Sequence, residues 1–208
     1  YSAHSILNIS GMAIGMACTI LILLWVQDEW SYDKHFRNSD NLYRVIEKQY
    51  FSGGEVSLFA VSPGILAAAL KEEYPEIIRS ARYSNPQFPM QKGREFIEAR
   101  IAIADKEFLN MFNIKFVSGD IKSALNGPYN IVITENLANK YFNNEDPLGK
   151  TLTSSSWVFT ITGIVKSLPH NSHLEFDIIF PSEFLKQIGV PVIDWGFRCY
   201  NYIELQKG

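Results

Sequence analysis

The chain opens with an apolar run, Ile6–Val26, which reads ILNISGMAIGMACTILILLWV. Its polar side chains are few: Asn8, Ser10 and Thr19. A helix of these 21 residues would be roughly 30 Å long, which matches the hydrocarbon core of a bilayer. The run therefore predicts a single transmembrane helix, and the folded part of the chain is expected to follow it outside the lipid.

Two other interpretations of the run are less favoured. A secretory signal peptide would have a basic start and a shorter apolar stretch. Here no Lys or Arg precedes the run, and it ends at Gln27–Trp30, a polar and acidic exit without a small-residue cleavage site. A buried core helix would normally carry a polar stripe. The sequence thus favours an uncleaved membrane anchor.

Charge is divided sharply along the chain. Of its 208 residues, 19 are Lys or Arg and 22 are Asp or Glu, and all of these lie after Gln27. The formal net charge of -3 argues against a nucleic-acid surface, which needs a basic patch or stripe. The composition of the remaining chain is that of an ordinary folded domain, long enough to bury a core.

The end of the apolar run is aromatic and acidic. Aromatic side chains suited to the headgroup region are Trp25, Trp30 and Tyr32. The acidic residues Asp28, Glu29 and Asp33 stand against one cation, Lys34. An acidic flank is compatible with the outer face of the membrane, because cytoplasmic flanks carry the excess of Lys and Arg.

Small residues form two rows on the predicted helix. Gly11 and Gly15 make a G-x-x-x-G pair, and Ala13 and Ala17 make a second row. Such rows allow another helix to approach closely, and we predict helix packing through Gly11 and Gly15. The alternative is that glycine is simply common in membrane helices.

The remaining sequence predicts an α+β domain. Its strands and helices alternate without a regular βαβ pattern. Strands are expected at 42–50, 56–61, 78–83, 87–92, 95–104, 131–133, 159–165, 174–180 and 200–205. Three helices are expected: one begins at Ser62–Pro63 and ends before Pro75, a short one is capped by Asp105, and one is capped by Thr134. Asp146–Gly149 predicts a turn.

No stretch carries a strong catalytic or metal-binding pattern. His170 and His173, with Glu175 and Asp177 nearby, could in principle hold zinc. The helical H-E-x-x-H spacing is absent, so a polar surface turn is the better interpretation. The sequence has no P-loop, no G-x-S-x-G elbow and no catalytic cysteine pattern. We expect neither an enzyme nor a bound cofactor.

The two cysteines are not expected to pair. Cys18 lies inside the apolar run, whereas Cys199 lies in the predicted last strand. A disulfide would require both residues to be in the bilayer. The aromatic residues recur at core spacing, so we interpret most of them as core rather than as a ligand cage.

Several stretches resemble the MacB/FtsX-type ABC transporter permeases, most closely those of Bacteroidetes. The first part carries LNISGMAIGMAC (7–18), DEWSYD (28–33) and NLYRV (41–45). The later part carries ITENLANKYF (133–142), EDPLGK (145–150), TGIV (162–165) and LPHNSH (168–173). These occur in the family's order over nearly the whole chain, so the chain resembles the first transmembrane helix and the MacB-like periplasmic core domain.

This resemblance implies a domain organisation. Residues 1–30 would be the first transmembrane helix and its flanks, and residues 31–208 would be the periplasmic core domain. Within that domain, residues about 38–104 and 197–208 would form a porter-like part, with a sabre-like part inserted at about 105–196. Three further membrane helices would follow in the parent protein, of which this chain would be an excerpt.

The resemblance also implies a function. The chain would belong to a permease subunit in the bacterial inner membrane that couples ATP hydrolysis by a separate cytoplasmic ATPase to movement in the periplasm. A second permease copy would be a partner, and a periplasmic adaptor or a lipoprotein could be another. Efflux and lipoprotein or envelope handling are the implied tasks. The alternative is a single-span sensor or binding module.

Overall fold

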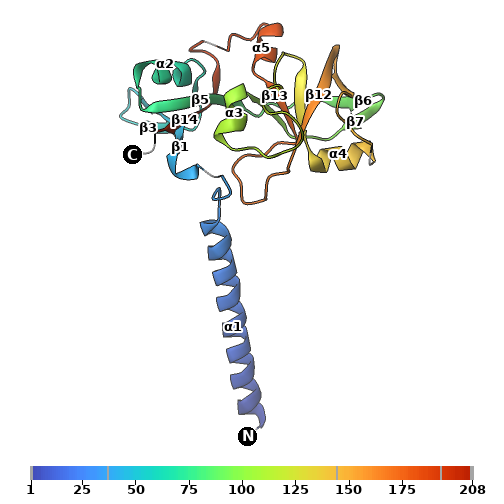
Figure 1. The fold of residues 1–208 in the computed structure, drawn as a ribbon. Coiled ribbons are helices and arrows are strands. Elements are labelled where there is room, and N and C mark those ends of the chain that lie inside the picture. The colour runs from blue at the N-terminus through green and yellow to red at the C-terminus, as the bar shows by residue number, and fades with distance from the viewer. Residues whose placement is uncertain (1, 37, 144, 193, 207–208) are drawn as a thin grey trace. The chain divides into compact units, whose positions relative to one another are not determined.

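The computed structural model describes residues 2–36, 38–143, 145–192 and 194–206 (Figure 1). The chain divides into two compact units, which are described separately. The first contains Tyr1–His35 together with Pro169–His173. The second contains Phe36–Leu168 and Leu174–Gly208.

The first unit is dominated by one long helix, α1 (Ser2–Trp30). Within it, Ala3–Trp30 is long and apolar enough to cross a membrane. The hydroxyls of Ser10 and Thr19 donate to the backbone carbonyls of Leu7 and Gly15, at 3.0 and 2.8 Å. These two hydroxyl groups are therefore satisfied within the helix itself. The predicted helix is confirmed and is longer than expected.

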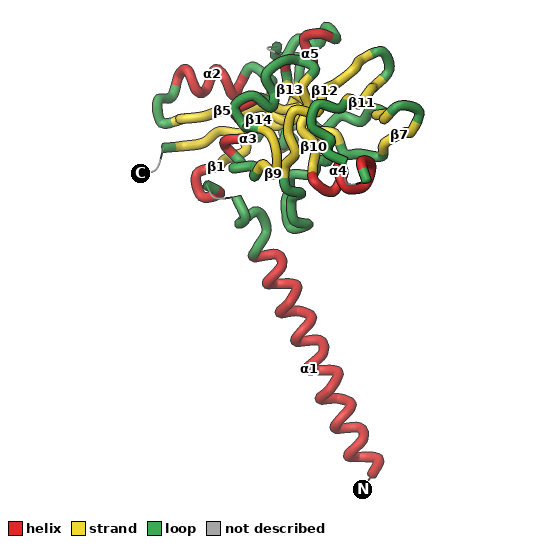
Figure 2. The backbone as a smooth tube through the Cα atoms, turned by 45° about the vertical axis from the view of Figure 1, so that its right-hand side comes forward, coloured by secondary structure: helices red, strands yellow, loops and turns green. Residues whose placement is uncertain are grey.

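The second unit is built on a mixed sheet of 12 strands (Figure 2). The order is β1-β14-β5-β8-β13-β10-β12-β11-β6-β7, with β4 paired to β14 and β9 paired to β12. The strands are β1 (Leu42–Val45), β4 (Ser62–Pro63), β5 (Ile77–Ser84), β6 (Met90–Lys92), β7 (Glu95–Ile97), β8 (Ile101–Ala104), β9 (Phe116–Gly119), β10 (Asn130–Thr134), β11 (Thr151–Ser154), β12 (Trp157–Val165), β13 (Ile178–Pro181) and β14 (Arg198–Leu205).

Two hydrophobic clusters cover the two faces of this sheet. Successive residues of a strand point to opposite faces, and β10 follows this rule: Val132 joins one cluster, whereas Ile131 and Ile133 join the other. Strands β8 and β13 divide in the same way. The central strands are thus buried on both faces, which explains their continuous apolar sequences.

Helices complete each cluster. The first cluster is closed by α3 (Lys106–Met111), whose Phe108 is fully buried. The second is closed by α4 (Glu135–Phe142), which follows β10, and by α5 (Glu183–Gln187) (Figure 2). A further helix, α2 (Leu66–Glu73), packs against β5, and a short 3-10 turn, η1, spans Ser39–Asn41. Mixed parallel and antiparallel pairing with interspersed helices confirms the α+β prediction.

The hairpin predictions are largely confirmed. Strands β2 (Glu47–Tyr50) and β3 (Val56–Phe59) pair as a separate two-stranded sheet, with Gly54 at φ +80° in the turn. Strands β6 and β7 pair around Gly93 at φ +62°. Glycine reaches these left-handed conformations without a steric cost. Residues 42–50 do not form one strand, because β1 pairs with β14 instead.

The start of α2 was predicted wrongly. Helix α2 begins at Leu66, whereas Ser62 and Pro63 form β4 against β14. The Ser62 hydroxyl does not cap the helix, because it accepts a hydrogen bond from the Asn201 side chain at 2.9 Å. Burial in the sheet thus outweighed a local Ser-Pro capping pattern.

Three further predictions need correction. Residues 95–104 form two strands, β7 and β8, rather than one. Of residues 174–180, only the part from Ile178 is strand. Asp105 occupies the N-cap of α3 but makes no side-chain capping bond, because its carboxylate pairs with Arg82. The Thr134 cap is confirmed: its hydroxyl accepts from the backbone N–H of Leu137 at 3.4 Å. Strands β9 and β11 and helix α5 were not predicted.

Candidate functional site

The end of α1 and the loop Pro169–His173 belong to one compact unit, although more than 130 residues separate them in sequence. We call this the junction; it comprises residues 28–35 and 169–173. The chain turns sharply after α1, and Asp33 adopts the left-handed conformation at φ 60°. Aspartate tolerates this conformation better than most residues. Its side chain and its backbone both face the loop.

Asn171 makes the central contacts of the junction. Its Nδ2 donates to Ser31 Oγ at 2.7 Å and to Ser31 O at 3.3 Å. In the opposite direction, the backbone N–H of Asp33 donates to the carbonyl of Asn171 at 2.9 Å. The loop and the helix exit therefore exchange hydrogen bonds through backbone and side chain, which fixes their mutual register.

Two histidine–aspartate pairs flank these contacts. His170 Nε2 lies 3.0 Å from Asp28 Oδ1, and His173 Nδ1 lies 2.8 Å from Asp33 Oδ2. The backbone N–H of His173 also donates to Asp33 Oδ1, at 3.0 Å. The His170 side chain is 83% exposed, whereas that of His173 is 27% exposed. Solvent therefore screens the contact at His173 less than the one at His170.

His35 lies beside the second pair. Its partial burial lowers its pKa, the Asp33 carboxylate opposes that shift, and the neighbouring His173 adds to it. The sign follows from the charged form: burial penalises imidazolium, so His35 is neutral over a wider pH range than a free histidine. Charging His35 on acidification therefore opposes its partial burial and the neighbouring His173, and only Asp33 favours it.

The structure separates the residues considered for a metal site. His170 and His173 face Asp28 and Asp33, as above, while Glu175 and Asp177 pair with a different partner, Arg100. The distances are 3.4 Å from Arg100 to Glu175 and 3.1 Å to Asp177. Among the described ranges, no group of three or more His, Cys, Asp or Glu residues has metal-binding geometry. The histidines are thus brought to the helix exit, a location that sequence reasoning did not anticipate.

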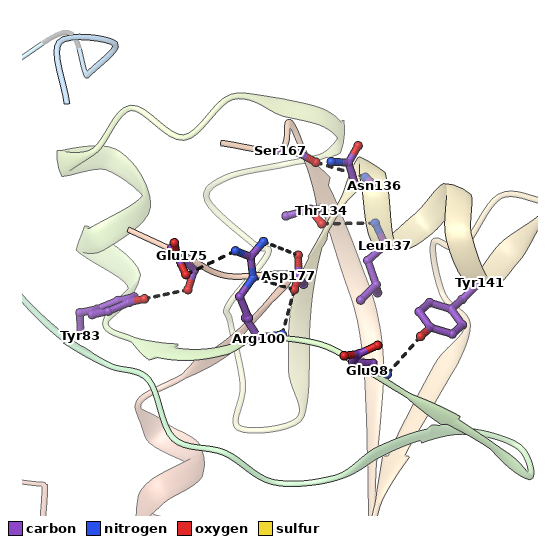
Figure 3. Close-up of polar contacts among 10 residues, drawn as sticks. All are labelled: Tyr83, Glu98, Arg100, Thr134, Asn136, Leu137, Tyr141, Ser167, Glu175 and Asp177. Atoms are coloured by element: carbon purple, nitrogen blue, oxygen red, sulfur yellow. Dashed lines mark hydrogen bonds and ion pairs between the residues drawn. The ribbon is translucent and has the colours of Figure 1, made fainter. Parts of the chain in front are cut away.

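The residues that flank the loop on either side belong to the second unit, and hydrogen bonds within that unit hold them (Figure 3). On the entering side, the Ser167 hydroxyl accepts from the backbone N–H of Asn136 at 3.2 Å, at the start of α4. On the leaving side, Arg100 binds both carboxylate oxygens of Asp177, and Tyr83 donates to the carbonyl of Glu175 at 3.2 Å. Burial raises the pKa of Tyr83 to about 12, so its hydroxyl remains a donor.

The predicted packing residues, Gly11 and Gly15, lie on the exposed surface of α1. A Cβ atom at either position would have nothing within 4 Å. The structure contains a single chain, so their role in helix packing stays a prediction. The cysteines are both free: Cys18 is exposed on α1 and Cys199 is buried in β14.

Sequence reasoning identified the two halves of the junction but not their contact. The acidic exit was interpreted as a membrane flank and the LPHNSH loop as a polar surface turn. The signal that could have joined them is chemical: two aspartates and a serine at the exit complement two histidines and an asparagine in the loop. Hydrogen-bonding complementarity alone is permissive, however, and many other polar pairs in the chain satisfy it.

Solved structures show the same fold. A domain of a protein named as a permease, from Porphyromonas gingivalis, superimposes with a TM-score of 0.74 at 27% identity, covering 83% of this chain and 76% of that one. The periplasmic region of MacB from Actinobacillus actinomycetemcomitans superimposes with a TM-score of 0.57 at 15% identity, covering 80% and 75%. No curated protein sequence matches the chain.

The sequence match is broader than either structural match. Residues 5–203 match the family described as MacB-like periplasmic core domain. That range includes most of α1, both halves of the junction and nearly all of the sheet. The chain therefore belongs to the family of MacB-like periplasmic core domains.

Proposed function

We propose that this chain is part of a permease subunit of an ABC transporter in the bacterial inner membrane, with residues after 30 in the periplasm. It couples ATP hydrolysis by a separate cytoplasmic ATPase to a conformational change in the periplasmic domain. The chain itself has no catalytic role in this proposal. Family membership supports the assignment, and the apolar helix supports the membrane location.

The junction is the observation that carries the proposal. A helix can transmit movement only if its end is fixed to the body that must move. Here six contacts among the described residues, four hydrogen bonds and two histidine–aspartate pairs, join the exit of α1 to the loop Pro169–His173. In the chain, the loop follows β12 and leads to β13. Hydrogen bonds hold the flanking residues Ser167 and Asp177 (Figure 3). Displacement of the helix exit therefore pulls on the loop as well as on residue 36.

The proposal includes a partner for the helix. Gly11 and Gly15 would allow a second helix to approach α1 closely, either in the same permease or in a second permease copy. A periplasmic adaptor or a lipoprotein would engage the domain, for efflux or for lipoprotein and envelope handling. We further propose that residues 38–104 and 197–208 form the porter-like part and residues 105–196 the sabre-like part; residues 207–208 lie outside the described residues.

The test uses the full-length parent permease with its ATPase in lipid nanodiscs. Hydrogen exchange across residues 38–206 is recorded with and without ATP in the wild type and in the double variant Ser31→Ala with Asn171→Ala. We expect ATP to change the exchange pattern in the wild type, and we expect most of that change to be lost in the variant while ATP turnover persists. The control is Asn130→Ala, which removes an asparagine bond to the Asn126 carbonyl far from the junction in sequence.

Two results would contradict the proposal. If the junction variant retained the full ATP-dependent change, the junction would not transmit it. If no ATPase bound the parent protein, the single-span sensor or binding module would become the better assignment. In that case the domain would respond to an envelope ligand rather than to nucleotide.

A further inference from the structure

A shallow groove runs along one face of α1 at its exit. Six residues line it: Leu23, Val26, Gln27, Trp30, Ser31 and Lys34. Their spacing of three and four residues places them on one side of the helix and the turn that follows it. The groove is apolar at the end nearer the helix centre and polar at the other end.

Lys34 sits at the polar end and is exposed. Within the described part of the chain, its ammonium group forms no ion pair, although Asp28 and Asp33 are close in sequence. Those two carboxylates face His170 and His173 instead. The Gln27 amide and the Trp30 indole N–H supply further donors beside this cation. An unpaired cation with neighbouring donors favours an anionic oxygen ligand.

The apolar end has the character of a lipid contact. Leu23 and Val26 belong to the span that is long enough to cross a membrane. Trp30 is 72% exposed, and an exposed tryptophan at the end of such a span is typical of the headgroup boundary. The groove thus has hydrocarbon-facing residues below this boundary and a cation above it.

The helical positions indicate which faces remain for other ligands. At about 100° per residue, the helical part of the groove is centred about 90° from the Gly11–Gly15 row. A helix packed on the glycines would therefore leave the groove open to lipid. The acidic residues at the exit, Asp28 and Glu29, lie about 150° and about 110° from the groove centre on the same reckoning, so they do not face a ligand bound there.

We propose that this groove binds an anionic phospholipid of the bilayer. Lys34, with Gln27 and Trp30, holds the headgroup phosphate, while Leu23 and Val26 contact the first part of an acyl chain. The proposal rests on the membrane insertion of α1 that the proposed function requires. It adds a selective contact that would fix the depth and rotation of the helix at the junction, where movement leaves the membrane.

The test uses the full chain in phosphatidylcholine vesicles that contain a minor fraction of phosphatidylglycerol. Bromine is placed on the acyl chains of one lipid or the other, because it quenches nearby tryptophans. The contribution of Trp30 is the difference between the chain and its Trp30→Phe variant. We expect phosphatidylglycerol to be enriched about five-fold next to Trp30, as one cation near an anionic lipid predicts. Lys34→Gln should abolish the enrichment, and Lys34→Arg should restore it.

Trp25 provides the matched control. It lies on the same helix about 150° from the groove centre, and its contribution is obtained from Trp25→Phe in the same way. Equal quenching of Trp30 by both brominated lipids would overturn the proposal, as would an enrichment that persisted in Lys34→Gln or appeared equally at Trp25. Failure of any brominated lipid to quench either tryptophan would instead refute membrane insertion, and with it the proposed function.

Discussion

Removal of the Asn171 side chain should loosen the junction by a predictable amount. In Asn171→Ala, the bonds from Nδ2 to Ser31 Oγ and Ser31 O are lost, while the backbone carbonyl of residue 171 is retained. A side-chain hydrogen bond contributes about 1 kcal/mol to stability. Because the Asn171 side chain is only partly buried, we expect about 1 kcal/mol for the two bonds together rather than twice that. The equilibrium for opening of the junction should rise about five-fold.

The Asp33 amide reports this opening. Its N–H donates to the Asn171 carbonyl, so it exchanges with solvent only when the junction opens. Hydrogen exchange of the full chain in detergent or nanodiscs, read by NMR or by peptides covering residues 31–36, should show about five-fold faster exchange at this amide. Ser31→Ala should have a smaller effect, because the Ser31 carbonyl still accepts. The double variant should add little to Asn171→Ala, since both changes remove the same contact.

The control for this prediction is Asn130→Ala. Asn130 also donates from Nδ2 to a backbone carbonyl, that of Asn126 at 3.0 Å, but within the second unit. Its replacement should leave Asp33 exchange unchanged. If Asn171→Ala gave the same Asp33 exchange rate as Asn130→Ala, the hydrogen bonds at the junction would not hold it closed, and the reasoning would be refuted.

Three other predictions concern the sheet domain. Phe108→Ala should lower the free energy of unfolding by about 3–5 kcal/mol, because a fully buried ring is removed. Phe96→Ala removes a ring that is 68% exposed, so it should lower the free energy of unfolding by less than about 0.5 kcal/mol. Chemical denaturation measures both values, and equal effects would contradict the assignment of Phe108 to the core. The pKa of Tyr83 is raised to about 12, whereas tyrosine ordinarily has a pKa of about 10, so the unfolded chain loses this proton first as pH rises. The free energy of unfolding should therefore fall between these two pH values, and it should fall less steeply in Tyr83→Phe. Identical slopes in the two proteins would contradict the raised pKa of Tyr83. Burial raises the pKa of the Cys199 thiol to about 12. In a Cys18→Ala background, a maleimide should therefore label Cys199 near neutral pH only after the chain unfolds. Rapid labelling of the folded chain would show instead that the thiol is accessible.

Local sequence patterns predicted correctly those elements in which the local preference of the residues and their burial in the fold favour the same structure. The apolar length of α1, the buried run at β10 and the Thr134 cap each satisfy local and tertiary demands at once. The predicted hairpins succeeded for the same reason, since Gly54 and Gly93 occupy turn positions that require positive φ.

The failures arose where a tertiary partner changed the role of a residue. Ser62 had the local features of a helix cap, yet Asn201 engages its hydroxyl inside the sheet. Asp105 also preceded a helix, yet Arg82 binds its carboxylate. In each case the partner is distant in sequence, so local capping rules could not reveal the competition.

The candidate site was predictable only in fragments. The polar exit and the histidine loop were visible, but their contact depends on the topology that returns the chain to the helix after β12. Strand order in a mixed sheet of this size is not determined by strand periodicity, because the same alternation suits many pairings. The groove at the exit of α1 could not be predicted either. The sequence identified Lys34 as the cation of the exit but did not indicate which residues lie beside it on the surface.

The most direct test of the junction is the exchange rate of two amides in the full-length permease with its ATPase. The N–H groups of Asp33 and His173 each donate across the junction, to the Asn171 carbonyl and to the Asp33 carboxylate. If the helix exit and the loop move as one body, both amides will stay protected without nucleotide and with ATP bound. If either amide exchanged at the rate of an unstructured peptide in one of these states, the junction would open during the cycle and could not transmit the movement of α1.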